Sequence, residues 1–161
     1  MKKPVLVGLA ALALAGPGAA HALAISGATG YALSGDGSSL VAIADLAAPT
    51  AGPSVALTSG GAALSLDAIA YRPKTRELYG FSTLDDSVYL VDVGTGMSTK
   101  IASSMEAVEN APVGFDFNNV LDAARIVNTD DQNLVFFPNN TPPSISGAAQ
   151  GISPLFYVAG D

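Results

Sequence analysis

Residues 66–103, LDAIAYRPKTRELYGFSTLDDSVYLVDVGTGMSTKIAS, contain four short runs of β-forming residues separated by three turns. Val, Ile, Leu, Tyr and Phe dominate the runs, whereas Pro, Gly, Asp and Lys gather in the turns. The predicted strands are residues 66–71, 78–82, 87–93 and 98–103. Each connection is short enough for a β-hairpin. The stretch therefore predicts a four-stranded antiparallel sheet made of consecutive strands.

The pattern recurs on both sides of this stretch at a nearly constant distance. Tyr31 and Tyr79 are 48 positions apart. Val88 and Leu134 are 46 positions apart, and so are the phrases AIAYRP and GFDFNN. This alignment makes Ile126 the third-unit equivalent of the two tyrosines. Four antiparallel strands in a unit of about 40 to 50 residues are typical of a β-propeller blade.

The flanking units each contain three predicted strands. They are residues 30–34, 40–46 and 54–58 before the central stretch, and residues 113–118, 124–128 and 133–137 after it. A last run, 155–159, is predicted to begin a further unit. The predicted fold is therefore all-β, a propeller-like array of about three four-stranded blades. Because a ring closes with roughly four to eight blades, the predicted array is incomplete. This indicates either a shortened chain or self-association through the open sheet edges.

Residues 1–24 have the three parts of a secretory signal peptide. Lys2 and Lys3 are basic, an apolar run follows at 5–15, and A-x-A patterns end at Ala22 and Ala24. The run is about half the roughly 20 residues that cross a bilayer, so cleavage after Ala22 or Ala24 leaves no stable membrane span. The alternative is an uncleaved N-terminal anchor.

The predicted domain organisation is a signal peptide at 1–24 followed by a partial propeller-like domain at 25–161. The approximate units are residues 25–59, 60–104 and 105–154, with the start of a further unit at 155–161.

Loss of the signal peptide removes most catalytic chemistry. His21 is the only histidine, and the sequence contains no cysteine. The mature chain then lacks the residues for a serine–histidine triad, a cysteine nucleophile, or a zinc site of His or Cys ligands. Loss of Lys2 and Lys3 also takes the formal net charge from −7 to −9, which disfavours contact with nucleic acid phosphates. We expect no nucleic acid partner.

Acidic residues occupy equivalent turns of the three units. They are Asp36, Asp85, Asp86, Asp130 and Asp131. Stacked blades bring equivalent turns to one rim, where carboxylates can bind Ca²⁺, which prefers oxygen ligands. The alternative is that Asp suits hairpin turns, because its side chain bonds nearby backbone amides. Calcium is the one cofactor that the sequence suggests, and no other is expected.

Four further carboxylates stand at strand ends or beside apolar residues: Asp67, Asp92, Asp116 and Asp122. A pair of them can in principle act as general acid and base in a glycosidase, since that chemistry needs two carboxylates. The alternative is that Asp92 and Asp116 accept hydrogen bonds from the backbone or from Arg125 and fix the strand ends.

Four phrases resemble a known bacterial family, the "domain of unknown function 4394" proteins. They are AIAYRPKTRELYGF, SVYLVDVGTG, VGFDFNNVLDAARIVNTDDQNL and LFYVAGD. The resemblance covers residues 56–161 well and 25–58 loosely. It implies propeller-like repeats and export, and the chain corresponds to the N-terminal part of family domains. No catalytic residue is implied, because the family has no assigned activity.

The expected function is an exported, non-enzymatic, propeller-like module that binds or scaffolds an envelope or extracellular ligand. The expected location is periplasmic or extracellular. The alternative is a carboxylate- or calcium-dependent hydrolase on a propeller scaffold.

Overall fold

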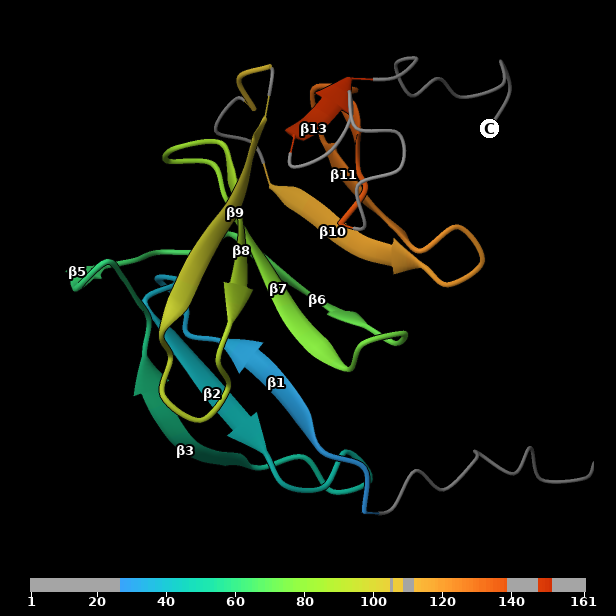
Figure 1. Ribbon diagram of the computed structural model, residues 1–161. Helices are drawn as coiled ribbons and strands as arrows, with labels where there is room; N and C mark the ends of the chain where they lie inside the picture. The colour runs from blue at the N-terminus through green and yellow to red at the C-terminus, as the bar shows by residue number, and fades with distance from the viewer. Residues whose placement is uncertain (1–26, 105, 109–111, 139–147, 152–161) are drawn as a thin grey trace, which may run out of the picture.

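The computed structural model describes residues 27–104, 106–108, 112–138 and 148–151 (Figure 1). The predicted signal peptide at 1–24 and the predicted run at 155–159 lie outside these residues. The described residues form strands, turns and irregular segments and include no helix. Within these ranges there is accordingly no helical segment of the length and apolarity that crossing a bilayer requires. The predicted all-β class is confirmed.

The described residues form strands β1 (Gly30–Leu33), β2 (Ser39–Ile43), β3 (Ala51–Ala56), β4 (Thr58–Ser59), β5 (Ala62–Ala63), β6 (Ala68–Arg72), β7 (Glu77–Ser82), β8 (Ser87–Val91), β9 (Ser98–Ser104), β10 (Val113–Asn118), β11 (Ala123–Asn128), β12 (Asn133–Phe136) and β13 (Ala148–Gly151). Each strand predicted within the described ranges is present, with ends displaced by up to three residues. The small hairpin β4–β5 and strand β13 have no counterpart in the prediction.

Three groups of consecutive strands form antiparallel sheets, which we call the first unit (β1–β3), the second unit (β6–β9) and the third unit (β10–β13). The second and third units join into one eight-stranded sheet, because β13 pairs in parallel with β9. The neighbouring strands within each unit pair antiparallel. The predicted consecutive antiparallel strands are therefore present in all three units.

The second unit is buried on both faces. Successive side chains of a strand point to opposite faces of the sheet, and β7 uses both. Leu78 belongs to an apolar cluster that includes Leu40 of the first unit. Tyr79 and Phe81 belong to a second cluster, which includes Phe117 of the third unit. Figure 1 shows the resulting order, with the green to yellow β6–β9 between the blue and teal β1–β3 and the orange β10–β12.

The same face of each unit contacts the unit that follows it. Leu33 pairs with Leu40 in the first unit, and both pack toward the second unit. Phe81 pairs with Val88 in the second unit, 48 positions later, and both pack toward the third unit. The offset predicted between the first and second units is thus confirmed.

The predicted equivalence of Tyr79 and Ile126 is wrong by one residue. The first hairpins of the second and third units have the same register at an offset of 46 positions. At that offset Tyr79 corresponds to Arg125, and Ile126 corresponds to Gly80. The β11–β12 loop is one residue shorter than the β7–β8 loop. The sequence alignment matched the residues after these loops and therefore shifted the strand before the loop by one residue.

The clusters predict that two leucines in or next to the second unit contribute very differently to the free energy of unfolding. Leu66 is 2% exposed in the cluster between the first and second units, whereas Leu84 is 86% exposed in the β7–β8 turn. Leu66→Ala is expected to lower the free energy of unfolding by about 2–5 kcal/mol. Leu84→Ala is the matched control and should change it by less than about 0.5 kcal/mol. Chemical denaturation measures both, and equal effects would contradict the burial of this face.

Candidate functional site

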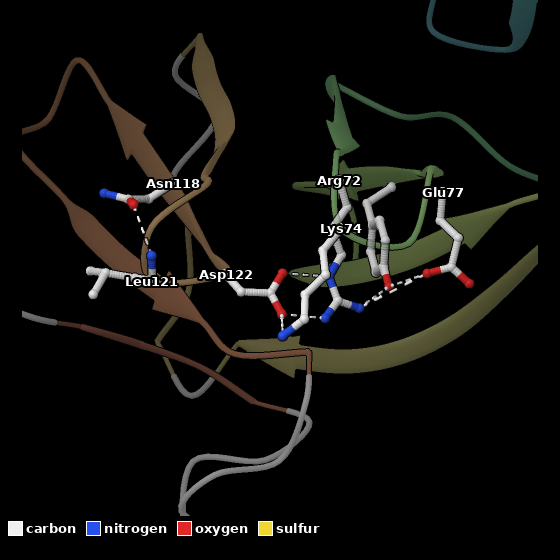
Figure 2. Close-up of polar contacts among 7 residues, drawn as sticks. Arg72, Lys74, Glu77, Asn118, Leu121 and Asp122 are labelled. Carbon is white, nitrogen blue, oxygen red and sulfur yellow. Dashed lines mark hydrogen bonds and ion pairs between the residues drawn. The ribbon is translucent and has the colours of Figure 1, made fainter.

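An ion pair between a buried arginine and a partly buried aspartate joins the second unit to the third. Arg72, the last residue of β6, is 3% exposed. Its Nε donates to Asp122 Oδ1 at 2.8 Å, and its Nη2 donates to Asp122 Oδ2 at 2.6 Å. Figure 2 shows this two-pronged contact between the two units. Such paired hydrogen bonds are among the strongest polar contacts in proteins and fix the relative orientation of their groups.

The turn between β10 and β11 presents Asp122 to the arginine. Asn118 Oδ1 accepts hydrogen bonds from the backbone N–H of Val120 at 2.9 Å and of Leu121 at 3.0 Å. The Asp122 N–H then donates to the Asn118 carbonyl, and Asp122 adopts a φ of 51°. Asn and Asp tolerate this left-handed conformation better than most residues. The local sequence therefore sets the direction of the carboxylate.

A third N–H donor of Arg72 is used within the second unit. Its Nη1 donates to the Tyr79 hydroxyl at 3.2 Å, and that hydroxyl donates to Glu77 Oε2 at 3.1 Å. The Tyr79 ring packs edge-on against Phe117, with centroids 5.1 Å apart. The polar contact is consequently embedded in the apolar cluster between the two units.

A second cation approaches the same carboxylate from solvent. Lys74 Nζ lies 3.2 Å from Asp122 Oδ2, and the lysine side chain is 65% exposed. Hydrogen bonds from Arg72 and, more weakly, from Lys74 hold the pKa of Asp122 at about 2, despite an opposing effect of burial. The hydrogen bond to Asp122 also raises the pKa of Arg72 above its ordinary range. Arg72 and Asp122 are therefore both ionised across the physiological pH range.

A hollow of about 370 Å³ lies where the β6–β7 turn meets the β10–β11 turn, and we call this place the seam. Its lining residues are Pro73, Lys74, Phe117, Asn118, Asn119, Val120 and Asp122. Val120 of this lining is 92% exposed, and its neighbour Leu121 is 63% exposed. Cavities of this size hold small ligands or single residues of a chain. The seam thus has an ammonium group and two side-chain amides close to the exposed apolar side chains of the β10–β11 turn.

The acidic turns predicted as calcium candidates have separate local roles. Asp36 accepts hydrogen bonds from the Ser34 and Ser38 hydroxyls, which hold its pKa at about 2. Asp86 accepts the N–H of Val108, and Asp130 donates its own N–H to Asn128. The contacts of Asp36 fit the turn interpretation, whereas the amide that Asp86 binds lies 22 positions along the chain.

Asp85 and Asp131 complete the set of acidic turn residues. Burial opposes ionisation of Asp85, but hydrogen bonds from Tyr89 at 2.7 Å and Lys100 at 3.0 Å outweigh it and lower its pKa. Asp131 occupies the left-handed region with a φ of 61°. Among the described residues, no three His, Cys, Asp or Glu side chains form a group that could hold a metal ion. A calcium site at these turns stays a prediction.

The carboxylates considered for catalysis lie at different turns and strands. Asp67 Oδ2 accepts the N–H and the hydroxyl of Thr83. Asp92 accepts the N–H groups of Thr95 and Gly94, which lower its pKa. A general acid needs the opposite shift. Both residues therefore act as turn-fixing acceptors.

The other two catalytic candidates belong to the third unit. Asp116 lies opposite Arg125 in the β10–β11 hairpin and accepts the N–H of Phe117. Asp122 is bound by Arg72 and Lys74. The sequence analysis gave Asp122 no cationic partner. The available signal was an arginine at the end of an apolar strand, which needs an acid when it is buried.

Comparisons with known proteins bear on the second and third units most directly. The model of a family described as Domain of unknown function (DUF4394) matches residues 40–161. No curated protein matches the chain. The match confirms the resemblance seen in the sequence, and it includes both sides of the seam.

Removing one partner of the buried pair should destabilise the protein strongly. Asp122→Asn leaves the Arg72 guanidinium buried without a counter-charge, and we expect a loss of about 3–5 kcal/mol in the free energy of unfolding. The double variant Arg72→Met, Asp122→Leu removes both charges and should recover part of that loss. Denaturation of the two variants measures the difference. A double variant less stable than Asp122→Asn would contradict this account.

The stabilising effect of Asp122 should disappear in acid. Its pKa is about 2 in the folded protein against an ordinary 3.8, so the carboxylate stabilises the fold above about pH 4. That contribution is lost as the pH falls from about 4 to about 2. The difference in unfolding free energy between the wild type and Asp122→Asn should therefore be constant near neutrality and shrink over this interval. A difference independent of pH would overturn the assignment.

Proposed function

We propose that this chain, which belongs to the family described as Domain of unknown function (DUF4394), is an exported β-propeller-like module that binds or scaffolds an envelope or extracellular ligand without catalysing a reaction.

The propeller part of the proposal is supported by how the units stack. The same face of each unit meets the next unit. In addition, β10, the first strand of the third unit, lies against β6, the first strand of the second. First strands of successive propeller blades lie side by side around a common axis. The pairing of β13 with β9 is a departure, because propeller blades are separate sheets.

The binding part rests on the seam, which is the observation that carries the proposal. Two turns from different units meet at one hollow, and the buried pair Arg72–Asp122 holds them in place. Loops on a rigid β scaffold are the usual location of binding residues. The exposed Val120 and Leu121 beside the hollow offer apolar surface to a partner.

The non-catalytic part is supported by the chemistry of the carboxylates. Asp92 and Asp122 have lowered pKa values and are occupied by hydrogen bonds. The sequence after residue 24 has no His and no Cys. The export part is supported by the basic start, apolar run and small residues of 1–24.

Site-specific photo-cross-linking in cells that produce the chain tests the proposal. A photoreactive amino acid at Val120 is expected to form adducts with material of the envelope or the medium. The same substitution at Leu84, which is also exposed but lies at the β7–β8 turn, is the matched control and should give few adducts.

Cross-linking of equal yield at both positions would contradict a binding role for the seam. Adducts found solely in the cytoplasmic fraction would contradict export.

A further inference from the structure

The first unit lacks a strand that the other two units have. The second and third units begin with the hairpins β6–β7 and β10–β11, and β10 lies against β6. Strand β1 corresponds to β7, at the offset of 48 positions that relates Leu33 to Phe81. In the part of the chain that the structure describes, the first unit has no counterpart of β6, and β1 is an edge of its sheet.

The backbone of β1 is open along this edge. Ser34 donates its N–H to the Ser39 carbonyl at 2.9 Å, across the β1–β2 hairpin. Because these groups alternate in direction along an antiparallel strand, the N–H and C=O groups of Tyr31 and Leu33 point away from β2. The equivalent groups of β7 face its partner β6. A further strand can therefore pair with β1.

The two edges of the first unit differ in their protection against such pairing. Strand β3 contains Pro53, which has no N–H to donate, and its register with β2 shifts between Val41 and Ile43. Prolines and register irregularities are ways in which proteins block a sheet edge. Strand β1 has the sequence GYAL, with no proline and no charge, and pairs with β2 in an unbroken register. The β1 edge is therefore the one suited to accept a strand.

Two tyrosines mark the surface that the absent strand leaves uncovered. Between the second and third units, Tyr79 packs edge-on against Phe117, and these side chains are 4% and 6% exposed. The corresponding residues between the first and second units are Tyr31 and Tyr71, which are 36% and 50% exposed. The same position is thus closed where the earlier unit has its first strand and open where it does not.

One segment of the chain is a predicted first strand without a unit of its own. Residues 155–159, Leu-Phe-Tyr-Val-Ala, are the run predicted to begin a further unit, which is the place that β6 and β10 occupy in theirs. The run lies outside the described residues. It contains neither proline nor charge, so it suits an edge that has neither. The segment and the β1 edge are therefore complementary in role.

The segment is too short to reach the β1 edge of its own copy. Strand β13 ends at Gly151 in the third unit, which packs on the opposite face of the second unit from the first (Figure 1). Packed sheets lie about 10 Å apart, so two such layers separate the first and third units by about 20 Å. The four residues from Gly151 to Leu155 span at most about 14 Å. A second copy is free of this restriction.

We propose that residues 155–159 of one copy add as a strand to the β1 edge of a second copy and cover Tyr31 and Tyr71. The added strand pairs antiparallel with β1, as β6 pairs with β7. Reciprocal exchange between two copies gives a closed, twofold-symmetric dimer. This surface goes beyond the proposed binding role of the seam and does not depend on it.

Sedimentation equilibrium at micromolar concentrations tests the dimer. The wild type is expected at twice the mass of one chain. Tyr31→Lys places a charge at the edge, and Tyr157→Pro removes an N–H from the donated strand, so each should weaken dimerisation at least about tenfold. Leu84→Lys makes the same kind of change at the exposed β7–β8 turn and should leave dimerisation unchanged. Thermal melting checks that the variants are folded.

Disulfide cross-linking tests the location independently, because the chain has no native cysteine. Tyr71→Cys is mixed under mild oxidation with Phe156→Cys or with Tyr157→Cys. Neighbouring residues of a strand point to opposite faces, so one of these two variants should form a cross-linked heterodimer with Tyr71→Cys and the other should form little. Leu84→Cys, the matched control, should form little with either.

Three results would overturn the proposal. One is a wild type that sediments as a monomer at tens of micromolar. Another is an equal loss of dimer in Tyr31→Lys and Leu84→Lys. The third is cross-linking that is equal through positions 71 and 84, or equal through positions 156 and 157.

Discussion

Burial of both faces of the second unit is the constraint on which the rest of the fold depends. Strand β7 alternates between the two apolar clusters, with Leu78 on one side and Tyr79 and Phe81 on the other. Gly80 fits this arrangement because a Cβ there would lie 2.4 Å from Leu66 Cδ1. A one-residue register shift of a strand with one solvent-exposed face disrupts packing on one side. The same shift in a strand that is buried on both faces disrupts packing on both sides. The first and third units therefore pack on opposite faces of the second unit.

The buried pair Arg72–Asp122 adds a directional contact to an interface that is otherwise apolar. Apolar packing is tolerant of small rotations, whereas two parallel hydrogen bonds to one guanidinium are not. Moving the third unit relative to the second would leave Arg72 buried without its acid, at a cost far above that of an imperfect apolar contact. Holding the two turns together by this pair also fixes the shape of the hollow, so the same contact contributes to the fold and to the site.

The sequence predicts strands well and relations between units less well. Strands such as β7 and β10 are evident because alternation and turn residues are local properties. The register of the third unit is not evident, because one residue fewer in a loop makes Ile126 equivalent to Gly80 and not to Tyr79. Strand β13 has the sequence Ala148–Gly151, with no large β-branched or aromatic residue to mark it. The pair Arg72–Asp122 spans 50 positions, and nothing local to either residue identifies its partner.

The contrast between the acidic turns and the seam explains why the latter is the better site. Asp36 and Asp85 each accept hydrogen bonds from side chains of their own unit, so their capacity is used in forming the turn. At the seam the geometry is set by two units together. The turn that presents Asp122 uses the oxygen of Asn118 and leaves its amide nitrogen free to donate within the described residues. Groups that are fixed in place and still have unused donors are preorganised for binding. A hollow between two rigid units meets that condition. A hairpin turn whose carboxylate is already hydrogen-bonded within its own unit does not.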